Sequence, residues 1–452
     1  MVTSISIMGL GKLGSPLAAC FAAAGFRVHA VDVDAQKVDA LNRGMPPVYE
    51  PGLAELIRES NGRLRASQDT EQAVRVSDAT FVIVGTPSEP GGGFSLRYVL
   101  PVCQSIGRVL RTKAGFHLVV LTSTVMPEST GGEVKTTLEQ VSGKRCGVDF
   151  GLCYSPEFIA LGTVIRDFYN PDFLLIGESD QRSGDLLAGL YRRVCKNSPP
   201  VARMNFVSAE ITKLAVNTYI TSKISFANMI ARLCECLPGA DANCVTGALG
   251  LDSRIGTKYL MGAVSYGGPC FPRDNRAMAA LAKRAGAFSD LAEVTDRFNR
   301  AQIKWIGELT KRHHSGNGPI GILGLTYKPD TDVVEESFGL LLAGELTSAN
   351  LPVVVYDPSA DRNRVTGINE RLRFVDSAQE CVERSDVVVI ATPWAQFHQI
   401  PCESWARHSP PRTVVDCWCA FTRLRGVDGV HYVRLGFGEE VERAADTSAS
   451  MD

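Results

Sequence analysis

The sequence predicts an α/β protein in which two Rossmann-like domains are joined by a long central helix and a small helical domain. Three observations carry this prediction. Short apolar runs alternate with helical segments near both ends of the chain, residues 208–237 have the periodicity of one helix, and an aspartate closes a strand in each half, at Asp32 and Asp357. The expected domains are a first α/β domain over 1–204, a central helical domain over 205–312, a second α/β domain over 313–440 and a disordered tail over 441–452.

Composition narrows the functional class. The chain has 452 residues, 45% hydrophobic and 21% charged, with a formal net charge of −2, which argues against a general nucleic-acid binder. No apolar run reaches the roughly 18 residues that a membrane span needs, and the N-terminus lacks the basic region of a signal peptide. Thirteen cysteines are scattered without a CxxC pair, so we expect no metal site and a reduced, cytoplasmic protein.

The first βαβ unit carries a dinucleotide signature. Gly9, Gly11 and Gly14 have GxGxxG spacing between a strand and a helix, and Asp32 ends the next strand. These glycines allow a tight turn, close approach of a pyrophosphate, and packing of helix on strand, while the aspartate accepts from ribose hydroxyls and repels a 2′-phosphate. NAD is therefore favoured over NADP. The expected elements are a strand at 4–8, a helix at 16–24 and a strand at 27–31.

The alternation continues with strand-like runs at 78–84 and 116–121, followed by Gly85-Thr86-Pro87 and Thr122-Ser123-Thr124. Both triplets fall at the carboxyl ends of parallel strands, the edge where ligands bind in open α/β sheets. Each threonine taken singly is as well explained as a cap of the next helix. Further strands are expected at 151–154 and 173–177.

The helix expected at 208–237 is about 45 Å long, too long for one small core, so it bridges two lobes or pairs with a second subunit. Ser208 is the expected N-cap. Lys213 and Asn217 are four residues apart and share a face. Taken alone, such a pair more often lies on a solvated helix surface.

A second α/β block follows the HHSGNG linker at 313–318. Its expected strands are 320–323, 352–356, 386–391 and 413–415. The block lacks a complete GxGxxG, so we expect it to bind a nucleotide or a phosphate rather than a second dinucleotide.

The stretch YGGPCFPRD, residues 266–274, places Cys270 between stiffening prolines and after two glycines. On its own, this stretch has two interpretations: a structural turn that contains a cysteine, or a preorganised loop that holds a nucleophile.

Together the motifs resemble the UDP-glucose/GDP-mannose 6-dehydrogenase family of nucleotide-sugar dehydrogenases. They are GLGKLG with VDVD, GTP, TSTV, SPEFIALGTVIRDFYNPD, AEITKLAVNTY, LGLDSRIG, GGPCFPRD and GLTYKPDTD, in this order from Gly9 to about Trp418. The resemblance implies an NAD-dependent, four-electron oxidation of a sugar C6 alcohol to the acid, for polysaccharide biosynthesis, by a homodimer or higher oligomer. GGPCFPRD is more similar to the UDP-glucose branch than to the GGHC-type N-acetyl-sugar branch.

The resemblance assigns the catalytic roles. Cys270 is the nucleophile that forms a thiohemiacetal and then a thioester. Lys213 stabilises the C6 alkoxide with Asn217 as hydrogen-bonding partner, and Asp274 works with this lysine and water. Glu157 is the general acid/base of thioester hydrolysis, and the Thr124 hydroxyl lies near that water.

The remaining expected contacts follow from the same resemblance. The cofactor set is Gly9, Gly11, Lys12, Leu13, Gly14, Asp32, Lys37, Gly85, Thr86, Pro87, Ser123 and Thr124. The substrate set is Phe158, Ile159, Lys213, Asn217, Arg254, Tyr259, Tyr266, Gly267 and Lys328. Within it, Tyr259 lies against the nucleotide base, Arg254 reaches into the partner subunit, and Lys328 meets the sugar or phosphate.

Three residues depart from the family pattern. Leu161 stands where a second carboxylate is usual, Glu335 where arginine is common, and Trp418 replaces the arginine of a DGRN-like segment. GDP-mannose, TDP-glucose or a UDP-N-acetylhexosamine therefore remain alternative substrates. A binding protein of the same fold with little turnover, and a two-electron dehydrogenase that leaves Cys270 unused, are the other readings.

Overall fold

The computed structural model describes residues 2–316 and 318–438, in two compact units. Unit 1 comprises residues 1–216 and 276–289, and unit 2 comprises residues 217–275 and 290 onward. Two of the three boundaries fall inside continuous helices, α9 (Phe206–Glu235) and α11 (Phe271–Arg284), and the third lies just before Asp290. The predicted division at 204/205 and 312/313 stays a prediction, and the predicted disordered tail, 441–452, lies outside the described residues.

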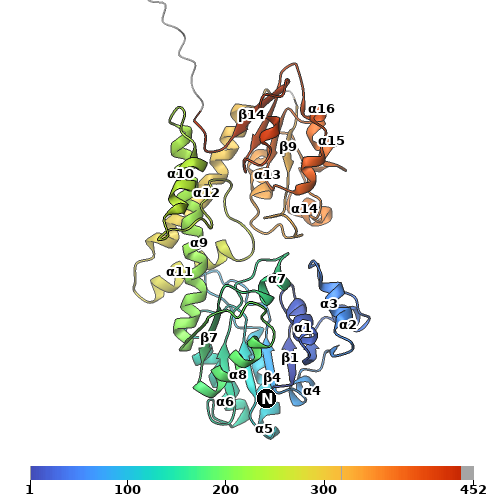
Figure 1. Cartoon of the computed structure of the whole chain (residues 1–452), viewed down its shortest axis with the longest axis vertical. Helices are drawn as coiled ribbons and strands as arrows, with labels where there is room; N and C mark the ends of the chain where they lie inside the picture. The colour runs from blue at the N-terminus through green and yellow to red at the C-terminus, as the bar shows by residue number, and fades with distance from the viewer. Residues whose placement is uncertain (1, 317, 439–452) are drawn as a thin grey trace, which may run out of the picture. The chain divides into compact units, whose positions relative to one another are not determined.

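Unit 1 is built on an eight-stranded sheet in the order β3-β2-β1-β4-β5-β6-β7-β8 (Figure 1). All neighbouring strands are parallel except β6 and β7, which pair antiparallel. The strands are β1 (Ser4–Met8), β2 (Arg27–Val31), β3 (Leu64–Ser67), β4 (Ala79–Val82), β5 (Leu118–Leu121), β6 (Gly151–Tyr154), β7 (Leu174–Glu178) and β8 (Val201–Met204).

Helices cover both faces of this sheet, which is why its central strands are apolar throughout. In β4, Phe81 packs into one core cluster with α1 and α8, whereas the next residue, Val82, packs into the other with α5. The helices of unit 1 are α1 (Gly14–Ala23), α2 (Ala35–Asn42), α3 (Leu53–Glu59), α4 (Thr70–Arg75), α5 (Val99–Thr112), the π-helical turn η1 (Thr130–Val134), α6 (Lys135–Ser142), α7 (Val164–Tyr169) and α8 (Gln181–Arg192).

The predicted strands of unit 1 are all present, and those at 4–8, 27–31 and 151–154 have the predicted bounds. The sequence analysis missed β3 and β8. Both are short and only partly buried, with exposed Arg65 and Arg203, so they lack the continuous apolar run of a central strand.

Helix α9 begins two residues before the predicted start. The Asn205 side chain accepts from the backbone N–H of Ser208 at 2.9 Å and so caps the helix. Ser208 lies inside the helix, and its predicted capping role is wrong. Leu214 is fully buried, whereas Met229 and Leu233 of the predicted periodic face are 46% and 55% exposed.

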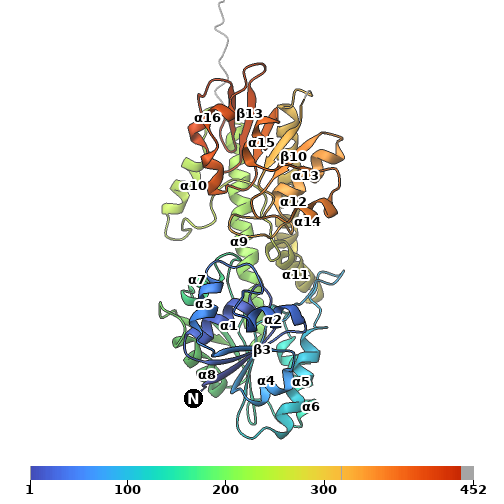
Figure 2. The same cartoon turned by 90° about the vertical axis from the view of Figure 1, so that its right-hand side faces the viewer.

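Unit 2 contains a six-stranded parallel sheet in the order β11-β10-β9-β12-β13-β14 (Figure 2). The strands are β9 (Ile320–Leu323), β10 (Val353–Tyr356), β11 (Arg373–Phe374), β12 (Val387–Ile390), β13 (Arg412–Asp416) and β14 (Val430–Arg434). The helices are α10 (Ala242–Leu251), α12 (Asp290–Arg312), α13 (Phe338–Ser348), α14 (Arg362–Ile368), α15 (Ala378–Glu383), α16 (Cys402–Trp405) and the 3₁₀ turns η2 (Ala395–Gln399) and η3 (Thr422–Leu424). The second Rossmann-like sheet is thus confirmed, and β11 and β14 are additions to it.

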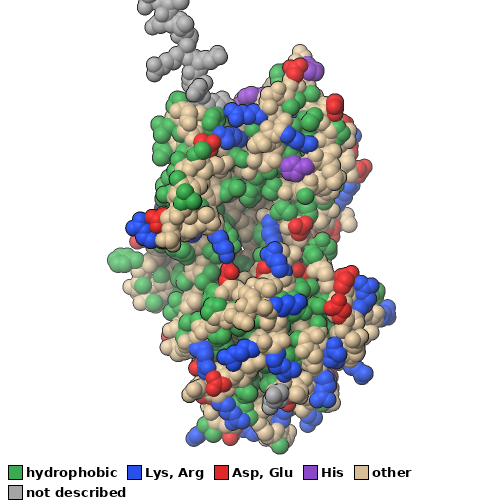
Figure 3. Space-filling model, viewed as in Figure 1, with side chains coloured by type: hydrophobic (Ala, Val, Ile, Leu, Met, Phe, Trp, Pro, Cys, Tyr) green, Lys and Arg blue, Asp and Glu red, His purple; other side chains and the backbone are tan. Residues whose placement is uncertain are grey.

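An apolar stripe runs along the part of α9 that belongs to unit 2. Its members are all large side chains between 44% and 67% exposed, and they recur at helical spacing: Tyr219, Phe226, Met229, Leu233 and, just past the helix end, Leu237. Figure 3 shows hydrophobic side chains gathered over α9 and α10. Such a stripe on a long helix is typical of an interaction surface.

Among the helices that the structure describes, none is both long enough and apolar enough to cross a membrane.

Candidate active site

The glycine turn after β1 has the geometry of a dinucleotide cradle. Gly9 has φ +108°, and a Cβ there would lie 2.3 Å from the Ile83 carbonyl oxygen. A Cβ on Gly14 would lie 1.9 Å from the Gly9 carbonyl oxygen. Gly11, in contrast, has no atom within 4 Å of the Cβ position. Two glycines therefore close the turn, and the third leaves open space where a pyrophosphate meets the N-terminus of α1.

Asp32 is placed at the carboxyl end of β2 and is tied to this turn. Its carboxylate accepts from the backbone N–H of Leu10 at 2.6 Å and of Asp34 at 2.9 Å, and Lys37 Nζ lies 3.7 Å away. Each carboxylate oxygen keeps further lone pairs that can accept from ribose hydroxyls. The residues of this turn fit NAD, with Lys12 and Leu13 following the open glycine.

The two loops predicted at the sheet edge lie together. Thr86 Oγ1 donates to the Thr124 carbonyl oxygen at 2.7 Å, and Ser123 Oγ donates to the Val84 carbonyl oxygen at 2.7 Å. Gly85 and Pro87 flank this link. The threonine after β4 therefore bonds the neighbouring loop, because β4 and β5 are adjacent and parallel.

Unit 1 brings Glu157 and Lys213 together. Lys213 is 7% exposed, and its Nζ donates to the backbone carbonyl of Glu157 at 2.7 Å. The same ammonium lies 4.6 Å from the ring centre of Phe158, whose ring is tilted by 35° against that of Phe173, with centroids 4.8 Å apart. Lys213 is therefore a buried cation, and the interpretation of a solvated helix surface is excluded.

The Glu157 carboxyl is an acid group tuned toward neutral pH. Burial of the carboxyl raises its pKa to about 7, although Tyr191, which donates to Oε1 at 3.2 Å, and the Lys213 charge both act to lower it. A pKa near the working pH is what general acid/base catalysis needs. Nearby, Ile159 and Leu161 pack against the apolar core of unit 1.

In unit 2, Cys270 lies at the N-terminal end of α11 and is exposed. Its carbonyl accepts the first helical hydrogen bond, from the Asp274 N–H at 2.8 Å. Cys270 therefore lies at the end of a helix whose dipole favours negative charge.

Asn217 and Asp274 form a buried pair in unit 2. The Asn217 Nδ2 atom donates to Asp274 Oδ2 at 2.6 Å, and the two residues are 7% and 1% exposed. Asn217 stands one turn after Lys213 on α9. The structure thus assigns Asn217 as the partner of Asp274, a pairing that the sequence analysis did not state.

The loop before Cys270 is held by side-chain amides that the sequence analysis missed. Asn228 of α9 bonds both Ala263 N–H and the Val264 carbonyl, at 2.8 and 3.1 Å. Asn299 of α12 bonds the N–H and the carbonyl of Tyr266, at 2.8 and 2.9 Å. These side-chain amides satisfy the buried backbone N–H and C=O groups of the loop, which in a sheet would bond a neighbouring strand. No motif signals them, because they lie 33 to 36 residues from their partners in the loop.

A second clamp comes from the segment after β9. Gly268 N–H donates to the Glu335 carbonyl oxygen at 3.1 Å, and a Cβ on Gly267 would lie 2.3 Å from the Glu336 carbonyl oxygen. A Cβ on Gly268 would lie 2.7 Å from the Tyr327 ring. Lys328 is the next residue after that tyrosine.

The other predicted substrate residues have different settings. Tyr266 is buried, and its hydroxyl accepts from Asn275 Nδ2 at 2.8 Å. Tyr259 is 49% exposed in a left-handed conformation, φ +65°. Arg254 is exposed, and its guanidinium pairs with Asp252 at 2.6 Å.

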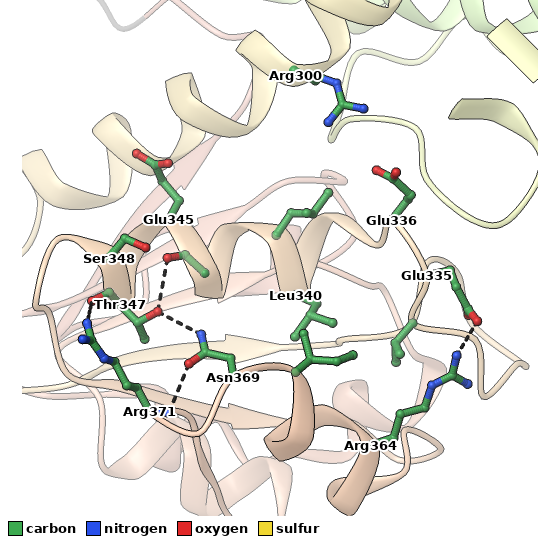
Figure 4. Close-up of a pocket in the computed structure, with 14 residues that line it drawn as sticks. Arg300, Glu335, Glu336, Leu340, Glu345, Thr347, Ser348, Arg364, Asn369 and Arg371 are labelled. Carbon is green, nitrogen blue, oxygen red and sulfur yellow. Dashed lines mark hydrogen bonds and ion pairs between the residues drawn. The ribbon is translucent and has the colours of Figure 1, made fainter. Parts of the chain in front are cut away.

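Two residues that depart from the family pattern, Glu335 and Trp418, make side-chain bonds within unit 2. Glu335 pairs with Arg364 at the side of a groove of about 920 Å³ between α13 and α14 (Figure 4). Trp418 packs against the core of unit 2, and its indole N–H donates to the Ala391 carbonyl at 2.9 Å. Of the residues named for the site, only Glu335 lines this groove. Two arginines also line it: Arg364 bonds the Glu335 carboxylate, and Arg371 bonds the Thr347 carbonyl.

Within residues 2–316 and 318–438, no group of three His, Cys, Asp or Glu side chains is placed to hold a metal ion.

The parallel sheet, the glycine cradle and the aspartate after β2 define an NAD-dependent dehydrogenase of the Rossmann type. Comparison with known proteins specifies it further: the chain belongs to the UDP-glucose/GDP-mannose dehydrogenase family. Residues 3–195 match the family's NAD binding domain, 207–301 its central domain and 321–423 its UDP binding domain. The chain is therefore an NAD-dependent nucleotide-sugar 6-dehydrogenase.

Individual relatives differ in substrate. UDP-glucose 6-dehydrogenase AglM of Haloferax volcanii is 36% identical over 94% of this chain and 98% of the relative. GDP-mannose 6-dehydrogenase of Pseudomonas putida is 34% identical over 88% of this chain and 93% of the relative. The solved structure of a UDP-glucose dehydrogenase from Pyrobaculum islandicum has a TM-score of 0.88 and 33% identity, covering 97% of this chain and 98% of that chain.

Proposed function

We propose that this enzyme oxidises UDP-glucose to UDP-glucuronate in two steps, through an aldehyde and a thioester on Cys270. The observation that carries the proposal is the Cys270 loop, which two side-chain amides and the Glu335 carbonyl clamp at the start of a helix, beside the buried pair of Asn217 and Asp274. A loop held from several sides is expected of a nucleophile that must meet a reacting carbon at one fixed position.

Cys270 makes the second oxidation, from aldehyde to acid, possible. NAD, when bound at the glycine cradle, accepts the hydride in each oxidation. The aldehyde carbon carries no hydroxyl, so the Cys270 thiolate adds to it and forms a thiohemiacetal. Loss of hydride leaves a thioester, and water then releases the carboxylate and restores the thiol.

The other residues act on charge and protons. Lys213 stabilises the alkoxide that forms at C6, and Asn217 donates to the same oxygen or positions Asp274. Donors of this type are typically worth about 3 kcal/mol each. Glu157 removes a proton from the hydrolytic water, helped by the Thr124 hydroxyl. Its pKa of about 7 supports this role, since the group gives and takes protons readily near neutral pH.

The remaining substrate contacts are proposals as well. Phe158 and Ile159 adjoin Glu157, and Tyr266, Gly267 and Lys328 adjoin Cys270. We propose Tyr259 at the nucleotide base and Arg254 as an arm toward a second subunit. The exposed setting of both residues supports these roles, because neither side chain is committed to the core.

The assignment of UDP-glucose rests on the PCFPRD form of the cysteine motif. Glu335 and Trp418 argue for an unusual pyrophosphate or sugar contact, because each stands where the family commonly has arginine. A panel of UDP-glucose, GDP-mannose, TDP-glucose and UDP-N-acetylhexosamines, assayed for NADH formed per sugar, tests the proposal. Two NADH from UDP-glucose support it, and a higher kcat/KM for another sugar would reassign the substrate.

The same assay addresses the alternative functions. One NADH per sugar would indicate a two-electron dehydrogenase, and binding without NADH would indicate a drifted nucleotide-sugar-binding protein. The buried Lys213 and the paired Asn217 favour turnover over mere binding.

We also propose a cytoplasmic homodimer or higher oligomer. The apolar stripe of α9 supports the dimer, since large side chains half exposed at helical spacing favour association. All thirteen cysteines are free thiols, which supports a reducing compartment.

A further inference from the structure

We propose that Tyr191 and Ser155 are positioning residues that hold the Glu157 carboxyl in place in both of its protonation states, through a hydrogen-bond chain that reverses direction. This inference rests on the proposed acid/base function of Glu157 and deepens it. The chain lies wholly within unit 1 and joins Glu157 Oε1, the Tyr191 hydroxyl, the Ser155 hydroxyl and the Leu175 carbonyl, at 3.2, 3.0 and 3.0 Å.

Both hydroxyls are built into the core. Tyr191 is fully buried and Ser155 is 2% exposed. The tyrosine ring packs edge-on against Phe81 and Phe168, with centroids 6.5 and 6.2 Å away. This packing fixes where the phenol oxygen points, so the hydroxyl cannot follow a moving carboxyl.

The protons can be assigned in each state. When Glu157 is ionised, Tyr191 O–H donates to the carboxylate and Ser155 O–H donates to the tyrosine oxygen. When Glu157 is protonated, its O–H donates to the tyrosine oxygen, Tyr191 donates to Ser155, and Ser155 donates to the Leu175 carbonyl. Every buried hydroxyl has a partner in both states, which a single fixed donor cannot provide.

Tyr191 stays neutral in both protonation states of Glu157. Burial, and then the neighbouring Glu157 charge, raise the pKa of Tyr191 well above its usual value, so the phenol keeps its proton. The other titratable groups that face Glu157 are the Lys213 ammonium from α9, Cys195 after α8 and Cys20 of α1. Burial raises the pKa of Cys20 to about 12 and of Cys195 to about 11, so Lys213 is the only charged neighbour among them.

Tyr191→Phe tests the chain because it removes one oxygen and keeps the packing of the ring. The carboxylate loses a charge-assisted donor, which is worth more than the neutral bond that the protonated form loses. The pKa of Glu157 in the variant is therefore expected to rise by about one unit. The acidic limb of the kcat–pH profile should move up by the same amount, with kcat about fivefold lower at pH 7, about tenfold lower at more acidic pH, and recovery at higher pH.

Two further variants calibrate this result. Tyr169→Phe is the matched control, because it removes a phenol oxygen in the same unit that bonds Cys20 rather than Glu157. Its profile should match the wild type. Ser155→Ala leaves Tyr191 in place and removes its support, so it should shift the limb in the same direction by less. It also keeps the test open should Tyr191→Phe not fold.

A titration of the Glu157 carboxyl by infrared difference spectroscopy separates this inference from the proposed function. The band is assigned by its loss in Glu157→Gln, and it needs no turnover. A higher titration midpoint in Tyr191→Phe or Ser155→Ala than in the wild type supports the chain, even in a protein that oxidises no nucleotide sugar. Equal midpoints, or a shift of equal size in Tyr169→Phe, overturn it.

Discussion

Replacing Gly268 by alanine should damage catalysis through backbone strain together with a clash against the Tyr327 ring. Gly268 has φ +82°, and an added Cβ would lie 2.7 Å from a Tyr327 ring carbon. The left-handed conformation costs a non-glycine residue about 1–2 kcal/mol. Overpacking against the ring adds about 1–3 kcal/mol. Unit 2 should therefore lose about 2–5 kcal/mol of stability or relieve the clash by moving the loop.

Gly426→Ala is the matched control for this variant. Gly426 also has a left-handed backbone, φ +77°, and its added Cβ would have no atom within 4 Å. It should cost only the conformational part, about 1–2 kcal/mol.

The assays are thermal unfolding and steady-state NADH formation. Because Gly268 is two residues from Cys270, a displacement of about 1 Å should lower kcat on the order of 100-fold. Gly426→Ala should keep its kcat. If Gly268→Ala matched Gly426→Ala in both stability and kcat, the clamp between the Cys270 loop and the Tyr327 segment would be refuted as a requirement for catalysis.

Four other predictions follow from the site. Cys270→Ser should release at most one NADH per sugar, measured against two for the wild type; a full second oxidation at the wild-type rate would exclude the nucleophile. Burial raises the pKa of Glu157 from an ordinary 4.5 to about 7, so the protonated carboxyl is favoured in the folded protein. Below about pH 4.5 the carboxyl is protonated in both states and its burial costs no folding free energy; as the pH rises through 7, the folded protein loses stability relative to the unfolded chain. Glu157→Gln should therefore raise the thermal midpoint relative to wild type at pH 8 more than at pH 5, and an equal difference at both would contradict the raised pKa. Asp32→Asn should weaken NADH binding about 10–100-fold in a fluorescence titration, because a charge-assisted acceptor is lost; unchanged affinity would remove Asp32 from the cofactor site. Phe226→Asp should shift the protein toward monomer in size-exclusion chromatography with light scattering, whereas Leu291→Asp, equally a change of an exposed apolar side chain (69% exposed), should not.

Much of unit 1 could be predicted because its signals are local. Strand β1, the three glycines and β2 are contiguous, and Gly14 is required by a contact with Gly9 in the same turn. The central strands are recognisable since helices bury both their faces and leave only apolar residues. Edge strands such as β3 gave no such run and were missed.

The Cys270 site shows where local signals end. The sequence contains a cysteine, a lysine and two acids that are typical of nucleotide-sugar dehydrogenases, and it places Lys213 one helical turn from Asn217. It does not show that Asn217 donates to Asp274, because those residues are far apart in the chain and only packing of α9 on α11 joins them. Nor does it show that Asn228 and Asn299 hold the loop, since a buried asparagine has the same sequence appearance as an exposed one.

The sequence by itself determined the two Rossmann-like sheets and the NAD cradle, because strand and helix periods and the spacing of the glycines are local features of the chain, whereas the nucleophilic role of Cys270 stays a prediction. Only the tertiary structure decided the partners: Tyr191 for Glu157, Asn217 for Asp274, and the Glu335 carbonyl for Gly268. Hydrogen bonds and burial set the pKa and position of each group, and both arise from segments that meet only when the chain folds.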